Sequence, residues 1–130
     1  MLSAGNQPIV GWTDIGTGER KFPSVVSLWQ WQPKTGTVGT AGAWKVTPYA
    51  NLDVYQPAFM PSVAVSSVAG QQNRPWMAFV EGATTQSNLW VREWNSPAQA
   101  WKTIGGRVNR QPATYIFLPK LRFDPQGRAT

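Results

Sequence analysis

Four short segments of this sequence occur twice, in the same order and with a similar pattern of apolar and aromatic residues. The first copies are QPIVGW, VSLWQW, GAWKVT and PSVAV, and the second are RPWMAF, LWVREW, QAWKTI and PKLRF. They begin at residues 7, 26, 42 and 61 and at residues 74, 89, 99 and 119. The spacing between copies changes only where a connecting loop changes length. Such a repeat constrains the whole fold, because both copies must satisfy the same packing.

Each repeated segment has the character of a short β-strand. Its apolar side chains alternate with polar ones or run continuously over about five to seven residues. Proline opens two of the strand types, at Pro8 and Pro75 and at Pro61 and Pro119, where a missing N–H costs least. The chain also holds 11 Pro and 12 Gly, spread along its whole length, so few helices are expected. The sequence therefore predicts an all-β fold of two four-stranded antiparallel units.

Such a unit, about 60 residues long, has the size and pattern of a β-propeller blade. The succession PSVAV, RPWMAFVE, LWVREWN and AWKTIGG resembles the blade repeat of secreted and cell-surface bacterial β-propellers. In that repeat, Pro-x-apolar-x-apolar leads to Pro-apolar-apolar-Ala-aromatic, then to apolar-x-Val-x-x-Trp and Trp-x-x-apolar-Gly. The resemblance covers essentially the whole chain and implies a propeller-type fold, although the sialidase-type Ser-x-Asp-x-Gly-x-Thr-Trp box is absent. It also favours an extracytoplasmic or extracellular location, without a visible signal peptide.

The phase of the repeat sets the expected boundaries of the units. Blade 1 is expected over residues 1–58, with strands near 8–13, 24–32 and 43–47. Blade 2 is expected over residues 59–117, with strands near 60–65, 75–80, 88–95 and 100–104. Residues 118–130 would supply the first strand of a following or exchanged blade. Two blades leave sheet edges unpaired, so we expect a homotrimer that completes a six-bladed ring, or a place in a larger assembly or longer propeller.

The eight Trp residues divide according to whether the repeat pairs them with a similar residue. Recurring aromatic positions indicate packing between neighbouring blades, where a large flat ring fills the space between twisted sheets. The residues expected in this structural core are Trp12, Trp31, Trp44, Phe79, Trp94 and Trp101. Trp29, Trp76 and Trp90 are matched by unlike residues and are the candidates for an exposed stacking surface, with packing as the open alternative.

A sugar site combines an aromatic ring with charged or amide groups that bind hydroxyls. Arg92 and Glu93 lie beside Trp90, so these three, with Trp29 and Trp76, are the candidate ligand-binding residues. Small homotrimeric fucose-binding lectins have a similar layout of two blades per chain, with sugars held by Arg, Glu and Trp. The resemblance to them lies in layout and not in motif, since the strand PWMAFV has no Arg. Two solvated charges are the alternative for Arg92 and Glu93.

The chain is basic, with 12 Lys and Arg against 6 Asp and Glu and a net charge of +6. The excess is greatest between residues 92 and 130, where it would attract an anionic partner such as an acidic glycan, lipid head groups or another subunit. Ordinary solvated charge is the alternative. Nucleic acid is not favoured, because Arg and Lys occur singly and no nucleic-acid-binding motif is present. No apolar run is long enough to predict a membrane span.

The composition argues against catalysis. The chain has no Cys and no His, which removes thiol chemistry, Ser-His-Asp arrangements and the usual metal ligands, and no cofactor is expected. Two functions are left open. The favoured one is a non-catalytic recognition module that binds a glycan or cell-surface ligand. The alternative is a structural subunit that docks onto protein partners, for which the insertions IGTGERKF and QPKTGTVGTAG would be docking elements.

Overall fold

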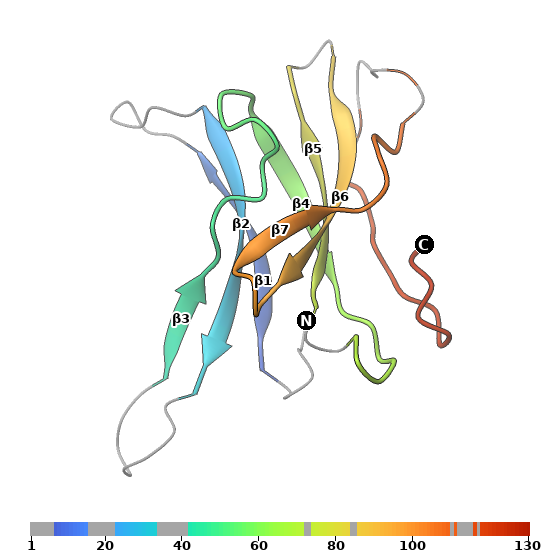
Figure 1. Cartoon of the computed structure of the whole chain (residues 1–130). Coiled ribbons are helices and arrows are strands. Elements are labelled where there is room, and N and C mark those ends of the chain that lie inside the picture. Colours follow the sequence, from blue (N-terminus) through green and yellow to red (C-terminus); the bar gives the residue numbers. More distant parts are fainter. Residues whose placement is uncertain are drawn as a thin grey trace.

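The computed structural model of the chain describes residues 7–15, 23–33, 42–71, 74–83, 86–109, 111, 116 and 118–130. These residues form seven strands and no helix, which confirms the all-β prediction (Figure 1). The strands are β1 (Ile9–Ile15), β2 (Ser24–Gln32), β3 (Ala43–Val46), β4 (Ala58–Ala64), β5 (Trp76–Glu81), β6 (Asn88–Asn95) and β7 (Ala100–Thr103). Each strand expected within residues 1–117 overlaps one of these.

The strands form two antiparallel sheets in which neighbours in the chain are neighbours in the sheet. The three-stranded sheet has the order β1-β2-β3, and the four-stranded sheet has the order β4-β5-β6-β7. Pairing within both is antiparallel throughout. Figure 1 shows the sheets side by side, with β4 next to the three-stranded sheet, and β4 contacts both β1 and β2.

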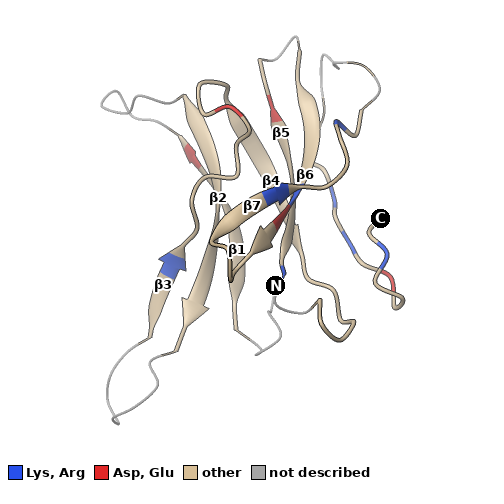
Figure 2. Cartoon of the chain, in the orientation of Figure 1, with Lys and Arg blue, Asp and Glu red and all other residues tan. Residues whose placement is uncertain are grey.

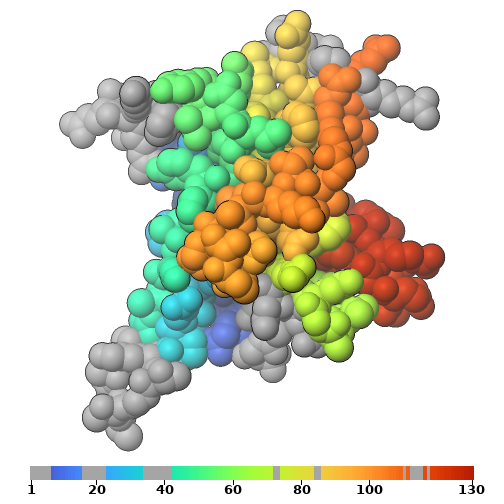
Figure 3. All heavy atoms as spheres, viewed as in Figure 1, coloured from blue at the N-terminus to red at the C-terminus, as the bar shows by residue number. Residues whose placement is uncertain are grey.

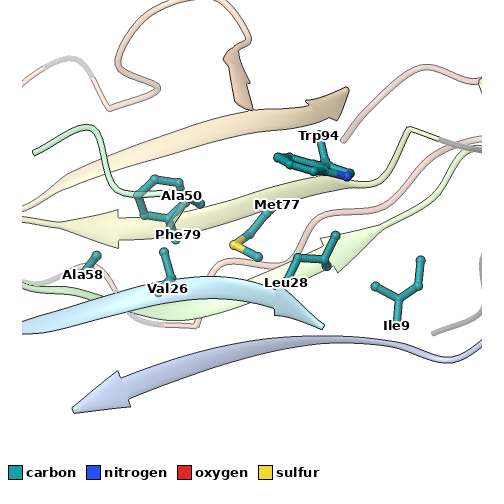
Figure 4. Close-up of a cluster of buried hydrophobic side chains, with 8 residues drawn as sticks. All are labelled: Ile9, Val26, Leu28, Ala50, Ala58, Met77, Phe79 and Trp94. Atoms are coloured by element: carbon teal, nitrogen blue, oxygen red, sulfur yellow. The ribbon is translucent and has the colours of Figure 1, made fainter. Parts of the chain in front are cut away.

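The main core lies between the two sheets. The three-stranded sheet contributes Ile9, Val26 and Leu28, and the inner face of the four-stranded sheet contributes Met77, Phe79 and Trp94, with Ala50 and Ala58 between them. Figure 4 shows the side chains of the two sheets pointing toward one another. Alternate residues of each strand supply these side chains, as the two-residue period of a strand requires.

Gly11 allows the sheets to approach closely. A Cβ atom built at Gly11 would lie 2.7 Å from Cγ2 of Val63 and 3.1 Å from Cβ of Pro61. A contact of 2.7 Å is too short for packed carbon atoms and one of 3.1 Å is tight, so the absent side chain leaves the space that β4 occupies.

A second, smaller cluster covers the outer face of the four-stranded sheet. It joins Ala64, Ala78 and Leu121, with partly buried side chains packed around them at Trp76, Leu89, Val91 and Phe123. Two of these residues belong to the C-terminal segment, which runs along the side of the sheet away from the three-stranded sheet (Figure 1).

The C-terminal segment belongs to neither of the two sheets. Within residues 118–130, the only β-pairing in the described part of the chain is a single bridge between Phe123 and Ala129. The segment lays its side chains on the face of the sheet instead of lying beside an edge, so it makes no ladder with another strand.

Two asparagines make the same contacts in the two sheets. Asn51 Oδ1 accepts a hydrogen bond from Val26 N at 3.0 Å, and Asn109 Oδ1 accepts one from Leu89 N at 2.8 Å. Each Asn amide also donates to the carbonyl oxygen two residues before its Val or Leu partner, Ser24 O at 3.3 Å and Ser87 O at 3.4 Å. Val26 and Leu89 are equivalent in the sequence repeat, so the two loops are tied to their strands alike.

The repeated tryptophans form equivalent ring pairs. The Trp31 and Trp44 ring centroids are 5.6 Å apart with planes at 70°, and the Trp94 and Trp101 centroids are 5.4 Å apart with planes at 57°. In each pair, the two Trp residues also face one another in the strand register. The first pair is edge-to-face and the second is tilted, and edge-to-face packing stabilises an aromatic pair beyond its buried area.

Candidate functional site

Arg92, a candidate ligand-binding residue, is engaged inside the protein. Its Nη1 donates hydrogen bonds to the carbonyl oxygens of Ala50 at 2.8 Å and Asn51 at 3.1 Å, and its Nη2 donates to that of Trp101 at 3.0 Å. Burial lowers the pKa of Arg92, against the opposing effect of the Glu81 carboxylate. The guanidinium therefore holds the connection between the two sheets against β6 and β7. Figure 3 shows this connection, in green, lying against the orange β7 region.

Glu93 points to the opposite face of the same strand. It is buried on the outer face of the four-stranded sheet, and its Oε1 lies 3.3 Å from Nη1 of Arg74. Successive strand residues point to opposite faces, so Arg92 and Glu93 cannot serve a single site.

The three candidate stacking tryptophans lie in three different places. Trp90 is half-buried against the core between the sheets. Trp76 is half-buried on the outer face, edge-to-face with Phe123 at a centroid distance of 5.1 Å. Trp29 is exposed on the other sheet, where its Nε1 donates to Ser27 Oγ at 3.2 Å. The structure therefore does not bring the five candidate ligand-binding residues together.

The residues expected in the structural core also divide. Phe79 and Trp94 are buried, and Trp31 and Trp101 are half-buried. Trp12 and Trp44 differ from the expectation, since they are 56% and 44% exposed. The physical reason is that no layer of the described residues covers the outward face of the three-stranded sheet.

This outward face, which we call the aromatic face, carries the exposed side chains Val10, Trp12, Trp29, Trp44 and Val46. Four of them, all except Val46, line an open hollow of about 410 Å³. The register places Val10 opposite Trp29, and Trp29 opposite Val46, so the side chains form one continuous surface across β1, β2 and β3.

A second hollow, of about 530 Å³, adjoins the aromatic face and shares Trp29 and Val46 with it. The residues lining it are Asp14, Ser27, Trp29, Val46, Thr47, Pro48 and Tyr49. This hollow combines an aromatic ring with a carboxylate and hydroxyl groups, whereas the side chains that line the first hollow are all apolar or aromatic.

The aromatic face corresponds, through the sequence repeat, to the inner face of the four-stranded sheet. Val10 matches Met77 and Trp12 matches Phe79. Met77 and Phe79 are fully buried, because the three-stranded sheet packs on them, whereas Val10 is 41% exposed. The same surface is therefore covered in one sheet and open in the other.

Glu81 is the buried carboxylate closest to the connection between the sheets. It accepts hydrogen bonds from Leu52 N at 2.8 Å and from Asp53 N at 3.4 Å. Burial raises the pKa of Glu81 above its ordinary value, against these two hydrogen bonds, which lower it; the Asp53 carboxylate raises it further and Arg92 lowers it. These contacts hold the connection between the two sheets against β5.

Groups that could hold a metal ion do not gather in the described part of the chain, where no three His, Cys, Asp or Glu side chains come together. The basic side chains are spread over β3, β6, β7, the connections between strands and the C-terminal segment (Figure 2). No helix that could cross a membrane occurs among the described residues. The two insertions expected to act as docking elements fall almost entirely outside those residues.

No protein-family model matches this chain, and no characterised protein or solved structure is similar enough to count as a match. The structure defines it as an all-β protein of two packed antiparallel sheets with an open aromatic face on one of them.

Proposed function

We propose that the chain is a non-catalytic docking module of the propeller type, a structural subunit whose aromatic face binds an apolar β-sheet surface of a protein partner. The observation that carries this proposal is the exposure of Trp12, Trp29 and Trp44 on one continuous sheet face. Contiguous exposed apolar surface of this kind marks an interaction site in soluble proteins.

The internal packing of the chain supports a sheet as the partner. The equivalent face of the four-stranded sheet is covered by apolar residues of the three-stranded sheet, with Ala50 of the connection between the sheets beside them. The two faces have the same alternation of side chains and residues of similar shape, so both favour packing against the apolar face of another sheet. Aromatic residues at the centre of such a contact supply most of its free energy, at about 2 kcal/mol or more for each hot-spot Trp.

The matched contacts of the two sheets support the propeller-type arrangement. Asn51 and Asn109, the paired Trp rings and the antiparallel strand orders are those of two copies of one unit. Two such blades need further blades to close a ring, supplied by other copies or by a larger assembly. The candidate residues for a sugar site, by contrast, are largely engaged in internal contacts.

Hydroxyl-radical footprinting of the full chain tests this proposal. The chain, tagged and recovered in its native assembly, would be compared with the same chain after dissociation. Trp12 and Trp44 should be oxidised more slowly in the assembly, and Tyr55, which is 61% exposed outside the aromatic face, should be oxidised equally in both. Equal oxidation of Trp12 in both states, or recovery of the chain only as a monomer, would contradict the proposal.

A glycan ligand is the second candidate function, favoured by the hollow beside Trp29. An aromatic ring next to Asp14 and Tyr49 offers both a stacking surface and polar groups for hydroxyls. Binding of a sugar there should change tryptophan fluorescence, and Trp29→Ala should abolish the change while Tyr55→Ala leaves it intact. The absence of a fluorescence change across a panel of neutral and acidic glycans would rule out this candidate.

A further inference from the structure

We infer that the open edge of β3 binds an extended segment of a partner protein, which joins the three-stranded sheet as a further strand and places an acidic side chain beside Lys45. The inference goes beyond the proposed function, which concerns the face of this sheet and not its edge. It is carried by the backbone of β3, by the comparison with the equivalent edge of β7 and by the charge of Lys45.

The backbone of β3 leaves hydrogen-bonding groups at the edge of its sheet. Thr47 N donates to Leu28 O at 2.9 Å, which fixes the direction of the backbone groups along β3. These groups alternate in an antiparallel pair, so Lys45 bonds toward β2, and Trp44 and Val46 turn their amide and carbonyl groups away from it. No strand of the described residues lies on that side, and all four residues of β3 are exposed (Figure 1). The edge therefore presents two N–H and two C=O groups to an incoming strand.

The equivalent edge of the four-stranded sheet is closed by the protein itself. Trp101 of β7, which matches Trp44, turns its carbonyl oxygen outward in the same way, and Arg92 Nη2 donates to it at 3.0 Å. The indole Nε1 of Trp101 donates to Pro48 O at 2.8 Å. In the three-stranded sheet, Trp29 stands where the other sheet has Arg92, and its Nε1 bonds a side chain of its own strand β2. The open edge of β3 is therefore a difference between two copies of one unit.

An added strand would continue both faces of the three-stranded sheet. Trp44 and Val46 carry their side chains on the aromatic face, whereas Lys45 between them points to the opposite side. Lys45 is exposed and makes no ion pair with any residue that the structure describes (Figure 2). The incoming segment should therefore alternate apolar residues, which extend the aromatic face, with an acidic residue that faces Lys45. On this side of β3, Lys45 belongs to a non-hydrogen-bonded pair, in which facing side chains are closest.

The same lysine disfavours a second β3 as the occupant of this edge. If two β3 strands paired antiparallel with Trp44 facing Val46, the two Lys45 side chains would lie directly opposite each other. Like charges at such a position destabilise a strand pair, and a lysine on an edge strand opposes self-pairing. An acidic segment of a partner protein replaces this repulsion with an attraction.

Nuclear magnetic resonance of the full, isotope-labelled chain with a synthetic peptide tests the inference. The probe is the capped peptide Ser-Thr-Val-Glu-Val-Thr-Ser, whose Glu would face Lys45 and whose Val residues would face Trp44 and Val46. Its addition should shift the amide signals of Trp44 and Val46 and leave that of Trp101, on the equivalent strand β7, unchanged. The absence of a shift at millimolar peptide would overturn the inference.

Two N-methylated forms of the probe separate strand pairing from a contact between side chains. Methyl groups on the amides of both Val residues remove the N–H groups that would donate to β3, so this peptide should not bind. Methyl groups on the amides of Glu and of the Thr after the second Val lie on the other side of the added strand, so this peptide should bind as the parent does. Equal binding of the two forms would contradict pairing with β3.

Charge reversal tests the role of Lys45. Lys45→Glu should weaken binding of the parent peptide by about fivefold or more, and it should bind the peptide with Lys in place of Glu more tightly than the wild type does. Lys102→Glu, at the equivalent exposed position of β7, should bind both peptides as the wild type does. If Lys45→Glu binds both peptides with wild-type affinity, the acidic character of the segment is wrong.

The edge of β3 and the aromatic face are tested separately. Protection of Trp12 in the native assembly without peptide binding at β3 would retain the docking function and overturn this inference. Peptide binding at β3 without protection of Trp12 would support the open edge and contradict the docking function.

Discussion

Single charged side chains hold together the connection between the two sheets. Arg92 donates to carbonyl oxygens at residues 50 and 51, and Glu81 accepts from the amides of residues 52 and 53. Burying charge is costly unless it is hydrogen-bonded, and both groups have backbone partners. An Arg beside aromatic residues suggests a ligand site, but here Arg92 binds the carbonyl groups of the protein's own loop.

Replacing Arg92 tests this structural role. Arg92→Met should lower the free energy of unfolding by about 1–3 kcal/mol, because buried carbonyl groups lose their donors. Lys102→Met, at an exposed position of β7, should change it by less than about 0.5 kcal/mol. Urea unfolding measures both, and equal stability of the two variants would return Arg92 to the candidates for ligand binding.

The raised pKa of Glu81 predicts a pH dependence. Because folding favours the protonated form of Glu81, this side chain contributes to the free energy of unfolding. The contribution is fully present below the ordinary pKa of 4.5 and is lost as the pH rises through the folded-state pKa. Glu81→Gln keeps an oxygen for Leu52 N and removes the charge. The variant should therefore gain stability relative to the wild type from about pH 4 to about pH 7. Urea unfolding of both proteins at about pH 4 and about pH 7 measures the difference in their free energies of unfolding. A difference that is the same at both pH values would contradict this prediction.

At the scale of elements, the approach of β4 to β1 sets how the two sheets pack. The close contact of Gly11 with Val63 and Pro61 leaves no room for a side chain. The equivalent residue of the other sheet, Ala78, has one, and there the covering residue is Leu121 of the C-terminal segment. Gly11 therefore sets the spacing of the two sheets where β4 meets β1, whereas Ala78 meets the C-terminal segment on the outer face.

A double-mutant cycle measures that contact. Gly11→Ala should lower the free energy of unfolding by about 1–3 kcal/mol through overpacking. Its cost should be smaller by at least about 0.5 kcal/mol when Val63→Ala is present, because the two positions compete for one space. Strictly additive effects would show that β4 does not press on Gly11.

For the whole molecule, the proposed docking of the aromatic face predicts that stability depends on assembly. A partner that binds only the folded state raises its apparent stability, and under this proposal a second copy would act as such a partner. In the single chain, Trp12 and Trp44 are exposed to solvent, although large aromatic side chains favour burial.

The thermal midpoint should therefore rise with protein concentration in the wild type. Trp12→Arg should have a lower midpoint that does not change with concentration, since its aromatic face no longer docks. Tyr55→Arg should keep the concentration dependence. Calorimetry over a wide range of concentration checks this, and a wild-type midpoint that is constant would argue against self-association.

Several features of the fold could be predicted from the sequence because they are local. Alternation of apolar residues, prolines at strand starts and Gly-rich loops indicated the strands within residues 1–117, and all of them form. The roles of Asn51 and Asn109 do not follow from the sequence, because an Asn in a loop resembles any turn residue until its strand is known. The recurrence of Asn at matched places in the repeat was the available signal.

What the sequence alone determined is the all-β character of the chain and the order and extent of its strands, since these follow from backbone preferences and the two-residue period. Only the tertiary structure decided which faces are covered. β1 has apolar residues on both sides, Ile9 and Gly11 on one and Val10 and Trp12 on the other, so its alternation cannot tell core from surface. Burial depends on which layer is placed over a face, and the role of Arg92 depends on carbonyl groups that folding brings from the connection between the sheets.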